Sequence, residues 1–267
     1  MADLKTRFIM NFITDDRWKY LADGLVVTLK VTFFAVLIGI AFGFLIAMIR
    51  ATYDKTGKLK ILNLICKIYL TVIRGTPVVV QLLIIYFVIF GSTQISKVLV
   101  AIMAFGINSA AYVAEIFRSG IMSIDDGQME AGRSLGFNYA QTMFYIIMPQ
   151  AFKNVLPALG NEFIVLLKET SVSGYIALQD LTKGGDIIRS RTYDAFMPLI
   201  AVALIYLVTI IVWCMASSKN QTFSREKTTL RILLEIQRHC IHTTRIMNIM
   251  KSLPADRNKL TFVISCS

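Results

Sequence analysis

The chain has 267 residues, of which 55% are hydrophobic and only 17% charged, with a mean hydropathy of +0.62. This balance excludes an ordinary soluble globule, in which about a quarter of the residues carry charge. The net charge of +11 does not indicate a nucleic-acid partner, because more than half of the excess lies after Ser217 and the remainder fits the basic residues that flank membrane spans. The composition therefore predicts a multi-span membrane protein in contact with lipid.

A first spanning helix is predicted at Val31–Ile49, which is uncharged and about as long as a bilayer requires. The next apolar region, Leu59–Gly91, is too long for one straight span, because as a helix it would reach about 50 Å across a hydrocarbon core of about 30 Å. We expect a structural break where glycine loosens the backbone and proline suits the first turn of a new helix. The residues of this break are Arg74, Gly75, Thr76 and Pro77.

The two sides of this break predict different helices. Leu59–Ile73 has Lys60, Asn63 and Lys67 between its apolar positions, so we expect a helix at the membrane interface or partly inserted. Pro77–Phe90 is then expected to form a second, short span.

Three further spans are predicted along the rest of the chain. Val98–Ala114 is closed by Glu115 and Arg118, whose helical spacing favours a structural ion pair. Leu156–Leu178 has helical length but contains three charged residues, and Ala195–Ser218 is uncharged. We therefore expect an all-α membrane protein with about five transmembrane helices.

Basic residues predict the orientation of these helices. Four of them follow the first span and face a single acidic residue, Asp54, which places that loop in the cytoplasm. The four are Arg50, Lys55, Lys58 and Lys60. With five spans, the N-terminus is then outside and the C-terminus inside.

The sequence lacks the motifs of a self-sufficient pump or enzyme. The Gly57-Lys58 pair is followed by leucine, so it does not form the phosphate-binding loop of an ATPase. Both histidines, His239 and His242, lie in the tail, and the four cysteines have no metal-binding spacing. We expect no catalytic residues, no metal and no cofactor in this chain.

A semi-polar segment, residues 128–151, interrupts the apolar runs. It predicts two short helices, Gln128–Leu135 and Ala140–Ile147, joined at Gly136, with Pro149 ending the second. Each helix would present an apolar face, carried by Ala131 and Leu135 and by Phe144 and Ile147. Such faces suit a cleft on a partner, but they also suit packing on the chain's own surface.

The spacing within this segment resembles the EAA loop of ABC importer permeases. Glu130-Ala131-Gly132 is followed by three residues, Gly136, nine residues, Ile146, one residue and Met148-Pro149. Gly132 and Met148 stand where the family has alanine and leucine. Because of this resemblance, we call residues 128–151 the EAA segment. Further stretches resemble the polar-amino-acid uptake branch, and together they cover most of residues 20–216. They are GLVVTLKVT, RGTPVVVQLLIIYF, AAYVAEIFRSGI and NEFIVLLKETSVSGYIALQDL.

The resemblance implies the membrane permease subunit of an ATP-driven amino-acid importer in the inner membrane of a prokaryote, with the fold of type I importers. Its implied partners are a cytoplasmic ABC ATPase dimer that binds the ATP, a second permease chain, identical or related, and an extracytoplasmic solute-binding protein. The implied domains are an outside segment, 1–23, and a permease domain, 24–218. The implied ATPase-docking residues are Glu130, Ala131, Gly132, Leu135, Gly136 and Pro149. The alternative is a self-contained secondary carrier or channel.

The candidate substrate path lies among polar residues of the third and fourth spans. Charged groups inside a span usually face the bundle interior or a water-filled cavity. Glu162 and Glu169 share one helical face, and a zwitterionic amino acid needs a carboxylate for its ammonium group. Alternatively, these charges pair with one another or with neighbouring spans. The candidates are Asn108, Glu162, Lys168, Glu169, Thr170 and Ser171.

The resemblance stops at the basic C-terminal tail, residues 219–267. An amphipathic helix at Arg231–Met250 on the membrane or a partner, a disordered tail and a non-native tail added by a reading-frame change all remain open.

Overall fold

The computed structural model describes residues 4–217, and these residues form helices without a strand. The predicted all-α class is therefore confirmed. The chain divides into two units, Met1–Cys214 and Met215–Ser267, and the second is described only at residues 215–217. The predictions for the tail, residues 219–267, lie outside the described residues.

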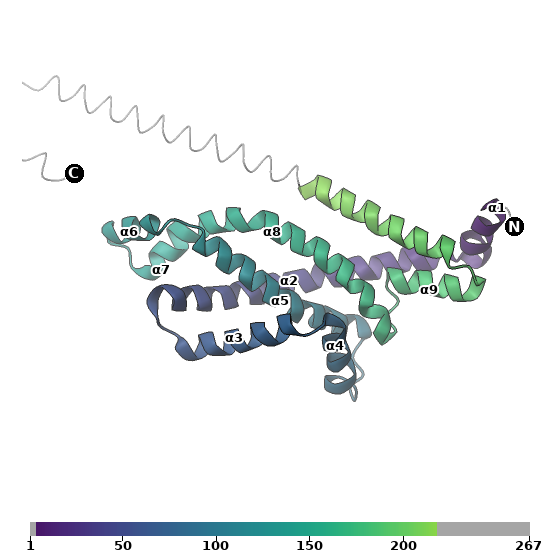
Figure 1. The fold of residues 1–267 in the computed structure, drawn as a ribbon, viewed down its shortest axis with the longest axis horizontal. Coiled ribbons are helices and arrows are strands. Elements are labelled where there is room, and N and C mark those ends of the chain that lie inside the picture. The colour runs from purple at the N-terminus through teal and green to yellow at the C-terminus, as the bar shows by residue number, and fades with distance from the viewer. Residues whose placement is uncertain (1–3, 218–267) are drawn as a thin grey trace, which may run out of the picture. The chain divides into compact units, whose positions relative to one another are not determined.

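Helices of very different lengths follow one another along the first unit (Figure 1). The N-terminal part has α1 (Leu4–Phe8), η1 (Ile9–Ile13), η2 (Thr14–Asp16), α2 (Trp18–Thr56), α3 (Lys60–Gly75), α4 (Val78–Leu83) and η3 (Ile84–Ile89). It is followed by α5 (Lys97–Met122), α6 (Asp126–Ser134), α7 (Tyr139–Thr142), η4 (Met143–Ile147), α8 (Met148–Glu169), η5 (Thr170–Ile176) and α9 (Leu181–Thr192). A last long helix spans Phe196–Ser217.

Three of the described helices are long and apolar enough to cross a membrane, namely α2, α5 and Phe196–Ser217. A fourth is added if α3 and the α4–η3 helix, which meet at a bend of 107°, form one broken span. The predicted number of about five spans is not confirmed. The break predicted at residues 74–77 is confirmed by this bend.

The second and third predicted spans need correction. A separate span at Pro77–Phe90 is wrong, because α4 and η3 have only six residues each and together reach about 18 Å. The third span does not close at Ala114, since α5 continues to Met122. The charge of Glu115 is compatible with a continuous helix because Arg50 and Arg118 pair with it.

The predicted bounds of the fourth apolar helix are also wrong. The fourth apolar helix is displaced, since α8 runs from Met148 to Glu169 and places Pro157 in its interior, whereas the residues after Glu169 form η5. The side chains of Val155, Phe163 and Leu166 are buried around this stretch, so packing holds the helix together where proline removes a hydrogen bond. At the other end of the chain, α2 is continuous from Trp18 across residue 23, and the extracytoplasmic segment predicted at 1–23 stays a prediction.

Close packing of α2 against α5 forms the centre of the described unit. A Cβ atom added at Gly39 would lie 2.7 Å from the Ser109 side chain, and one at Gly43 would lie 2.7 Å from Val113. Glycine at these positions therefore lets the two backbones approach, as is common where helices meet in membranes. A buried apolar cluster continues from this contact to α4 and α8 through Val31, Leu82, Phe105 and Leu166.

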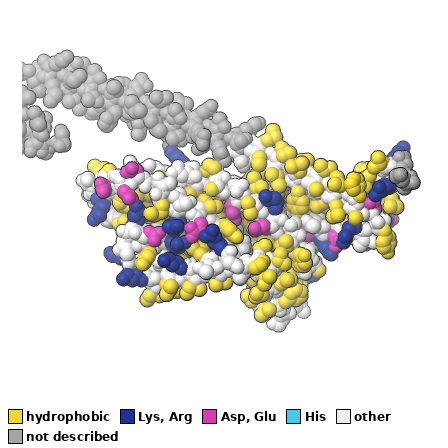
Figure 2. Space-filling model, viewed as in Figure 1, with side chains coloured by type: hydrophobic (Ala, Val, Ile, Leu, Met, Phe, Trp, Pro, Cys, Tyr) yellow, Lys and Arg dark blue, Asp and Glu magenta, His cyan; other side chains and the backbone are white. Residues whose placement is uncertain are grey.

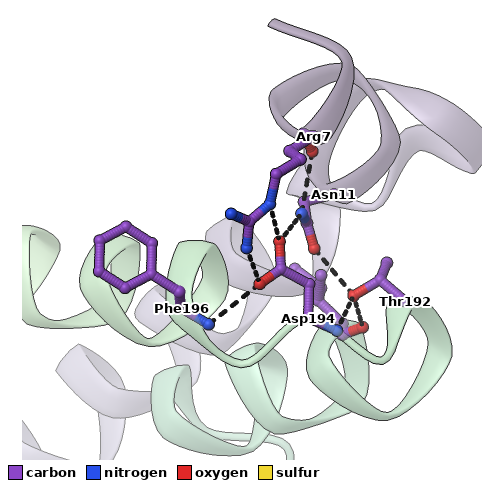
Figure 3. Close-up of polar contacts among 6 residues, drawn as sticks. Arg7, Asn11, Thr192, Asp194 and Phe196 are labelled. Atoms are coloured by element: carbon purple, nitrogen blue, oxygen red, sulfur yellow. Dashed lines mark hydrogen bonds and ion pairs between the residues drawn. The ribbon is translucent and has the colours of Figure 1, made fainter. Parts of the chain in front are cut away.

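The N-terminal segment is tied to the end of α9 by a polar network (Figure 3). The Arg7 guanidinium donates two hydrogen bonds, of 2.6 and 3.1 Å, to the two carboxylate oxygens of Asp194. Asn11 is fully buried, donates to the same carboxylate at 3.0 Å and accepts from Thr192 at 2.8 Å. The hydrogen bonds from Arg7 hold the pKa of Asp194 below its usual range. The network thus joins residues that lie 187 positions apart.

Replacing Asp194 with asparagine is expected to lower the thermal stability of the purified chain at neutral pH, since Arg7 and Asn11 lose a charged acceptor. A depressed folded pKa gives stability that is fully present above the unfolded value, about 3.9, and is lost as the pH falls through the folded value. The difference between wild type and Asp194→Asn should therefore narrow in acid. Thermal unfolding in detergent across this pH range measures it, and a gap that is constant with pH would contradict the role of the carboxylate charge.

Candidate functional site

The first helix of the EAA segment, α6, ends in a turn that depends on Gly136. The N–H of Gly136 donates to the backbone oxygen of Arg133 at 2.9 Å, and the N–H of Phe137 donates to the backbone oxygen of Gly132 at 3.1 Å. This pair of hydrogen bonds defines a Schellman helix end. Gly136 has φ of +82°, a left-handed conformation that favours glycine. The turn predicted at Gly136 is therefore confirmed, and α6 lies close to the predicted 128–135.

The second helix begins with a capping box that the sequence analysis missed. The Asn138 side chain accepts from the N–H of Gln141 at 2.9 Å, and the Gln141 side chain accepts from the N–H of Asn138 at 2.9 Å. The spacing Asn-x-x-Gln was the available signal. The prediction that Pro149 ends this helix is wrong. The helical run continues through the π-helical turn η4 into α8, whose first turn contains Pro149, where a missing N–H is tolerated.

One side of the EAA segment packs on the ends of α2 and α5. Met143 and Ile147 are buried in a cluster with Ala51 of α2 and Ile121 of α5. Of the two alternatives left open for Ile147, a cleft on a partner and packing on the chain's own surface, this cluster supports the second. Lys55 of α2 and Asp126 form an ion pair at the same place. The segment is thus fixed to the two central helices.

The other side of the EAA segment is exposed. Gly132 is buried, because a Cβ atom there would lie 2.5 Å from the Thr142 methyl group, whereas the remaining predicted docking residues are exposed. Large apolar side chains accompany them on this surface, with Leu135 74% and Tyr145 74% exposed. The exposed set is Glu130, Ala131, Leu135, Gly136, Phe137, Phe144, Tyr145 and Pro149.

A buried amide network holds the break between α3 and α4. The Gln81 side-chain amide donates to the backbone oxygens of Ile73 at 2.7 Å and Thr76 at 3.0 Å, so it satisfies carbonyls that the broken helix leaves free. Its oxygen accepts from Asn108 of α5 at 3.0 Å. Sequence analysis identified Asn108 and the break but missed Gln81, which joins them.

The neighbouring residue on α5 reaches the candidate path on α8. Ser109 donates to the carboxylate of Glu162 at 2.9 Å, and both side chains are buried. Glu162 therefore contacts the residue next to Asn108 on α5. The side-chain oxygen of Asn108 is buried and has no hydrogen-bond partner among the described residues. A carboxylate and a free amide oxygen are both acceptors that suit an ammonium group.

The remaining path candidates do not share this location. Lys168 is exposed, Glu169 is half-buried, and Thr170 is buried with its hydroxyl donating to the backbone oxygen of Leu167. Ser171 lines a cavity of about 400 Å³ beside α9, whose lining includes neither Asn108 nor Glu162. In that cavity, hydrogen bonds from Lys183 and Arg189 hold the pKa of Asp186 below its usual range.

Within residues 4–217, no three His, Cys, Asp or Glu side chains are grouped to hold a metal ion.

Residues 39–216 match the family described as the inner membrane component of binding-protein-dependent transport systems. The chain belongs to this family. It is therefore an integral inner-membrane subunit of a transport system and not itself an enzyme.

The match with this chain covers most of the length of two curated relatives. An arginine transport system permease protein, ArtQ of Bacillus subtilis, is 37% identical over 195 residues, which are 72% of this chain and 87% of the relative. A putative glutamine transport system permease protein, GlnP of Rickettsia typhi, is 36% identical over 193 residues, 72% of this chain and 86% of the relative.

Solved structures agree with the fold. A crystal structure of an amino acid ABC transporter with histidines is 42% identical, with a TM-score of 0.72, and the match covers 83% of this chain and 99% of that one. The inward-facing MetNI methionine ABC transporter is 18% identical, with a TM-score of 0.68 over 78% of this chain and 98% of that one, and shows the fold alone.

Gln81→Leu is expected to destabilise the chain, because it leaves the buried Asn108 amide without its acceptor, a loss of about 1–3 kcal/mol. Adding Asn108→Leu should recover part of this loss, since both polar partners are then gone. Thermal unfolding of the single and double variants measures the effect, with Val80→Ala on the exposed side of α4 as the control. A double variant less stable than Gln81→Leu would show that Asn108 is stabilised by something other than Gln81.

Proposed function

We propose that this chain is the permease subunit of an ATP-driven amino-acid importer and that the EAA segment docks a separate ATPase. The observation that carries the proposal is the two-sided EAA segment. Its inner side is packed on α2 and α5, whereas its outer side exposes Leu135 beside Gly136, and Phe144 and Tyr145 in η4. Large apolar side chains on a firmly anchored segment suit insertion into a cleft of a partner. The amino-acid cargo is supported by the names of the curated relatives.

The remaining parts of the machine follow the same proposal. Three or four candidate spans within residues 4–217 are few for enclosing a path, so a second permease chain, identical or related, completes it. The ATPase binds on the cytoplasmic side. The opposite end of α2 and the polar network at Asp194 then lie toward an extracytoplasmic solute-binding protein. This orientation agrees with the basic residues after the first uncharged run. ATP is bound by the partner ATPase, and no cofactor is assigned to this chain.

Gly136→Asp is expected to abolish co-purification of the ATPase with the tagged permease. Aspartate tolerates the left-handed conformation, so its effect here comes from a side chain and a negative charge added to the exposed surface that would enter the partner's cleft. Gly136→Asn should retain more of the ATPase, since asparagine tolerates the same conformation and has nearly the same size but no charge. The measurement is the amount of ATPase recovered from co-expressing cells.

Gly57→Asp is the matched control for this experiment. Gly57 also follows a helix end in a left-handed conformation, with φ of +67°, and has open space around it, but it lies at the end of α2 outside the EAA segment. The Gly57→Asp permease should still co-purify with the ATPase. Equal recovery from all variants, or transport by the chain alone without ATP, would reject the proposal and favour a self-contained carrier.

We propose that the substrate path runs along the polar stretch of α5 at Asn108 and Ser109, which contacts α4 through Gln81 and α8 through Glu162. Glu162 provides a buried carboxylate, held by Ser109, that would receive an ammonium group, and Asn108 adds a buried amide oxygen without a partner among the described residues. Lys168 and Glu169 lie farther along α8, with Thr170 and Ser171 just beyond it, and would act nearer the mouth of the path.

Glu162→Gln is expected to reduce solute-stimulated ATP hydrolysis by tenfold or more, which corresponds to about 1.4 kcal/mol of lost interaction. The glutamine can still accept the hydrogen bond from Ser109, so assembly with the ATPase should be unchanged. The measurement is ATPase stimulation in proteoliposomes against co-purification of the complex. Full stimulation in an intact complex would remove Glu162 from the path.

A further inference from the structure

A basic cavity of about 460 Å³ lies among α2, α3 and α5 and is not explained by the transport path. Its charged lining consists of Arg50 from α2, Lys67 and Arg74 from α3, and Glu115 from α5. Thr71 adds a hydroxyl on the same side of α3 as Lys67 and Arg74. The cavity therefore presents three cations and one carboxylate.

The single carboxylate is already engaged on several sides. Glu115 pairs with Arg50, with Arg118 at 3.4 Å and with Arg74 at a longer 3.9 Å. Lys67 has no ion pair with a described residue. Arg74 has only the 3.9 Å ion pair with Glu115 and a cation–π contact with the Tyr112 ring, 5.7 Å from its centroid. The charge balance of the cavity leaves room for an anion.

Arg50 gives a second, independent indication. Its Nε atom is buried and has no hydrogen-bond acceptor among the described residues. A buried donor without an acceptor is unfavourable, by about 1–3 kcal/mol and more when it is charged. An oxygen of a bound anion would satisfy this donor.

The cavity lies at the end of the apolar part of α2. Arg50 directly follows the uncharged run Val31–Ile49 of α2, so it marks the end of the apolar part of that helix. The end of an apolar run meets the interface between hydrocarbon and water, where phosphate groups lie and where basic side chains anchor.

An exposed apolar strip on α3 runs beside the basic residues. Leu64, Ile68 and Val72 follow one another at a spacing of four and are more than half exposed. Figure 2 shows basic side chains gathered where α3 lies beside α5, with hydrophobic side chains bordering them. A phosphate in the cavity would thus have a surface for acyl chains next to it, which favours a lipid over a free anion.

We propose that this cavity binds the phosphate of an anionic phospholipid, with the acyl chains lying along the outer face of α3. Lys67, Arg74 and the free Arg50 donor hold the headgroup, and Thr71 donates a hydrogen bond to it. Basic pockets between membrane helices on the cytoplasmic side recognise anionic lipids in this way. The proposal requires only that the chain lies in a membrane, so it does not depend on ATPase docking or on the cargo.

The test is lipid binding by the full-length chain, purified in detergent, stripped of lipid and titrated with phosphatidylglycerol or phosphatidylcholine under native mass spectrometry. Wild type should prefer phosphatidylglycerol by tenfold or more. Lys67→Gln with Arg74→Gln should abolish this preference, because the two cations without close carboxylate partners are removed. The control, Lys58→Gln with Lys60→Gln, removes the same charge outside the cavity lining and should keep it.

A second arm separates a lipid from free phosphate. Ile68→Ser should weaken phosphatidylglycerol binding and leave the weak competition by inorganic phosphate unchanged, since it alters only the apolar strip. Equal binding of both lipids by wild type, or an unchanged preference in the double variant with normal thermal unfolding, would overturn the proposal. Phosphate that binds as tightly as phosphatidylglycerol would overturn the lipid source. ATPase co-purification is scored separately, so its failure bears on the proposed function alone.

Discussion

The backbones of α2 and α5 approach closely because glycine occupies the contact positions, and the rest of the described unit is arranged around that contact. Lipid tails are as apolar as leucine, so burial alone gives helices in a bilayer little reason to associate. Close approach replaces that force with van der Waals contact, and Gly39 and Gly43 leave no space for a Cβ atom against Ser109 and Val113. Ser109, which packs against Gly39, also donates a hydrogen bond to Glu162, so α8 joins the same contact.

Because α2 has 39 residues, about 58 Å of helix, it carries this contact to both ends of the unit. At one end Ala51 is buried against Met143 and Ile147 of the EAA segment. At the other end the Thr28 hydroxyl accepts from the N–H of Leu181 at the start of α9. The EAA segment and α9, whose far end carries the polar network at Asp194, are therefore both attached to one long helix, α2.

The features that could be predicted from sequence depend on neighbouring residues. The break at 74–77 depends on proline and glycine, the turn at Gly136 depends on a backbone conformation, and the uncharged runs depend on composition. These signals are local, and each was sufficient to place its element.

The features that could not be predicted depend on contacts between distant residues. Glu115 was expected to close a helix, but Arg50, which lies 65 positions away, pairs with it and the helix continues. Gln81 was overlooked because a lone glutamine in an apolar run has no pattern, and its role becomes visible only with Asn108 beside it. Pro149 was expected to end a helix, but the π-helical turn before it lets the chain continue into α8.

The continuity of α8 links the EAA segment to the candidate path. Met148 and Glu162 lie in one helix, about 21 Å apart along its axis. Beyond Pro157 the helix is held to the last span, because the Trp213 indole donates to the backbone oxygen of Gly160 at 3.2 Å and stacks on Phe163 with ring centroids 3.8 Å apart. Before Pro157 it is held by Met148 and Ala151, which are buried against α2 and α5. Pro157 has no N–H, so α8 lacks a backbone hydrogen bond between these two anchored halves. A displacement of the EAA segment by a docked partner would therefore bend α8 at Pro157 and change the position of Glu162 relative to Ser109.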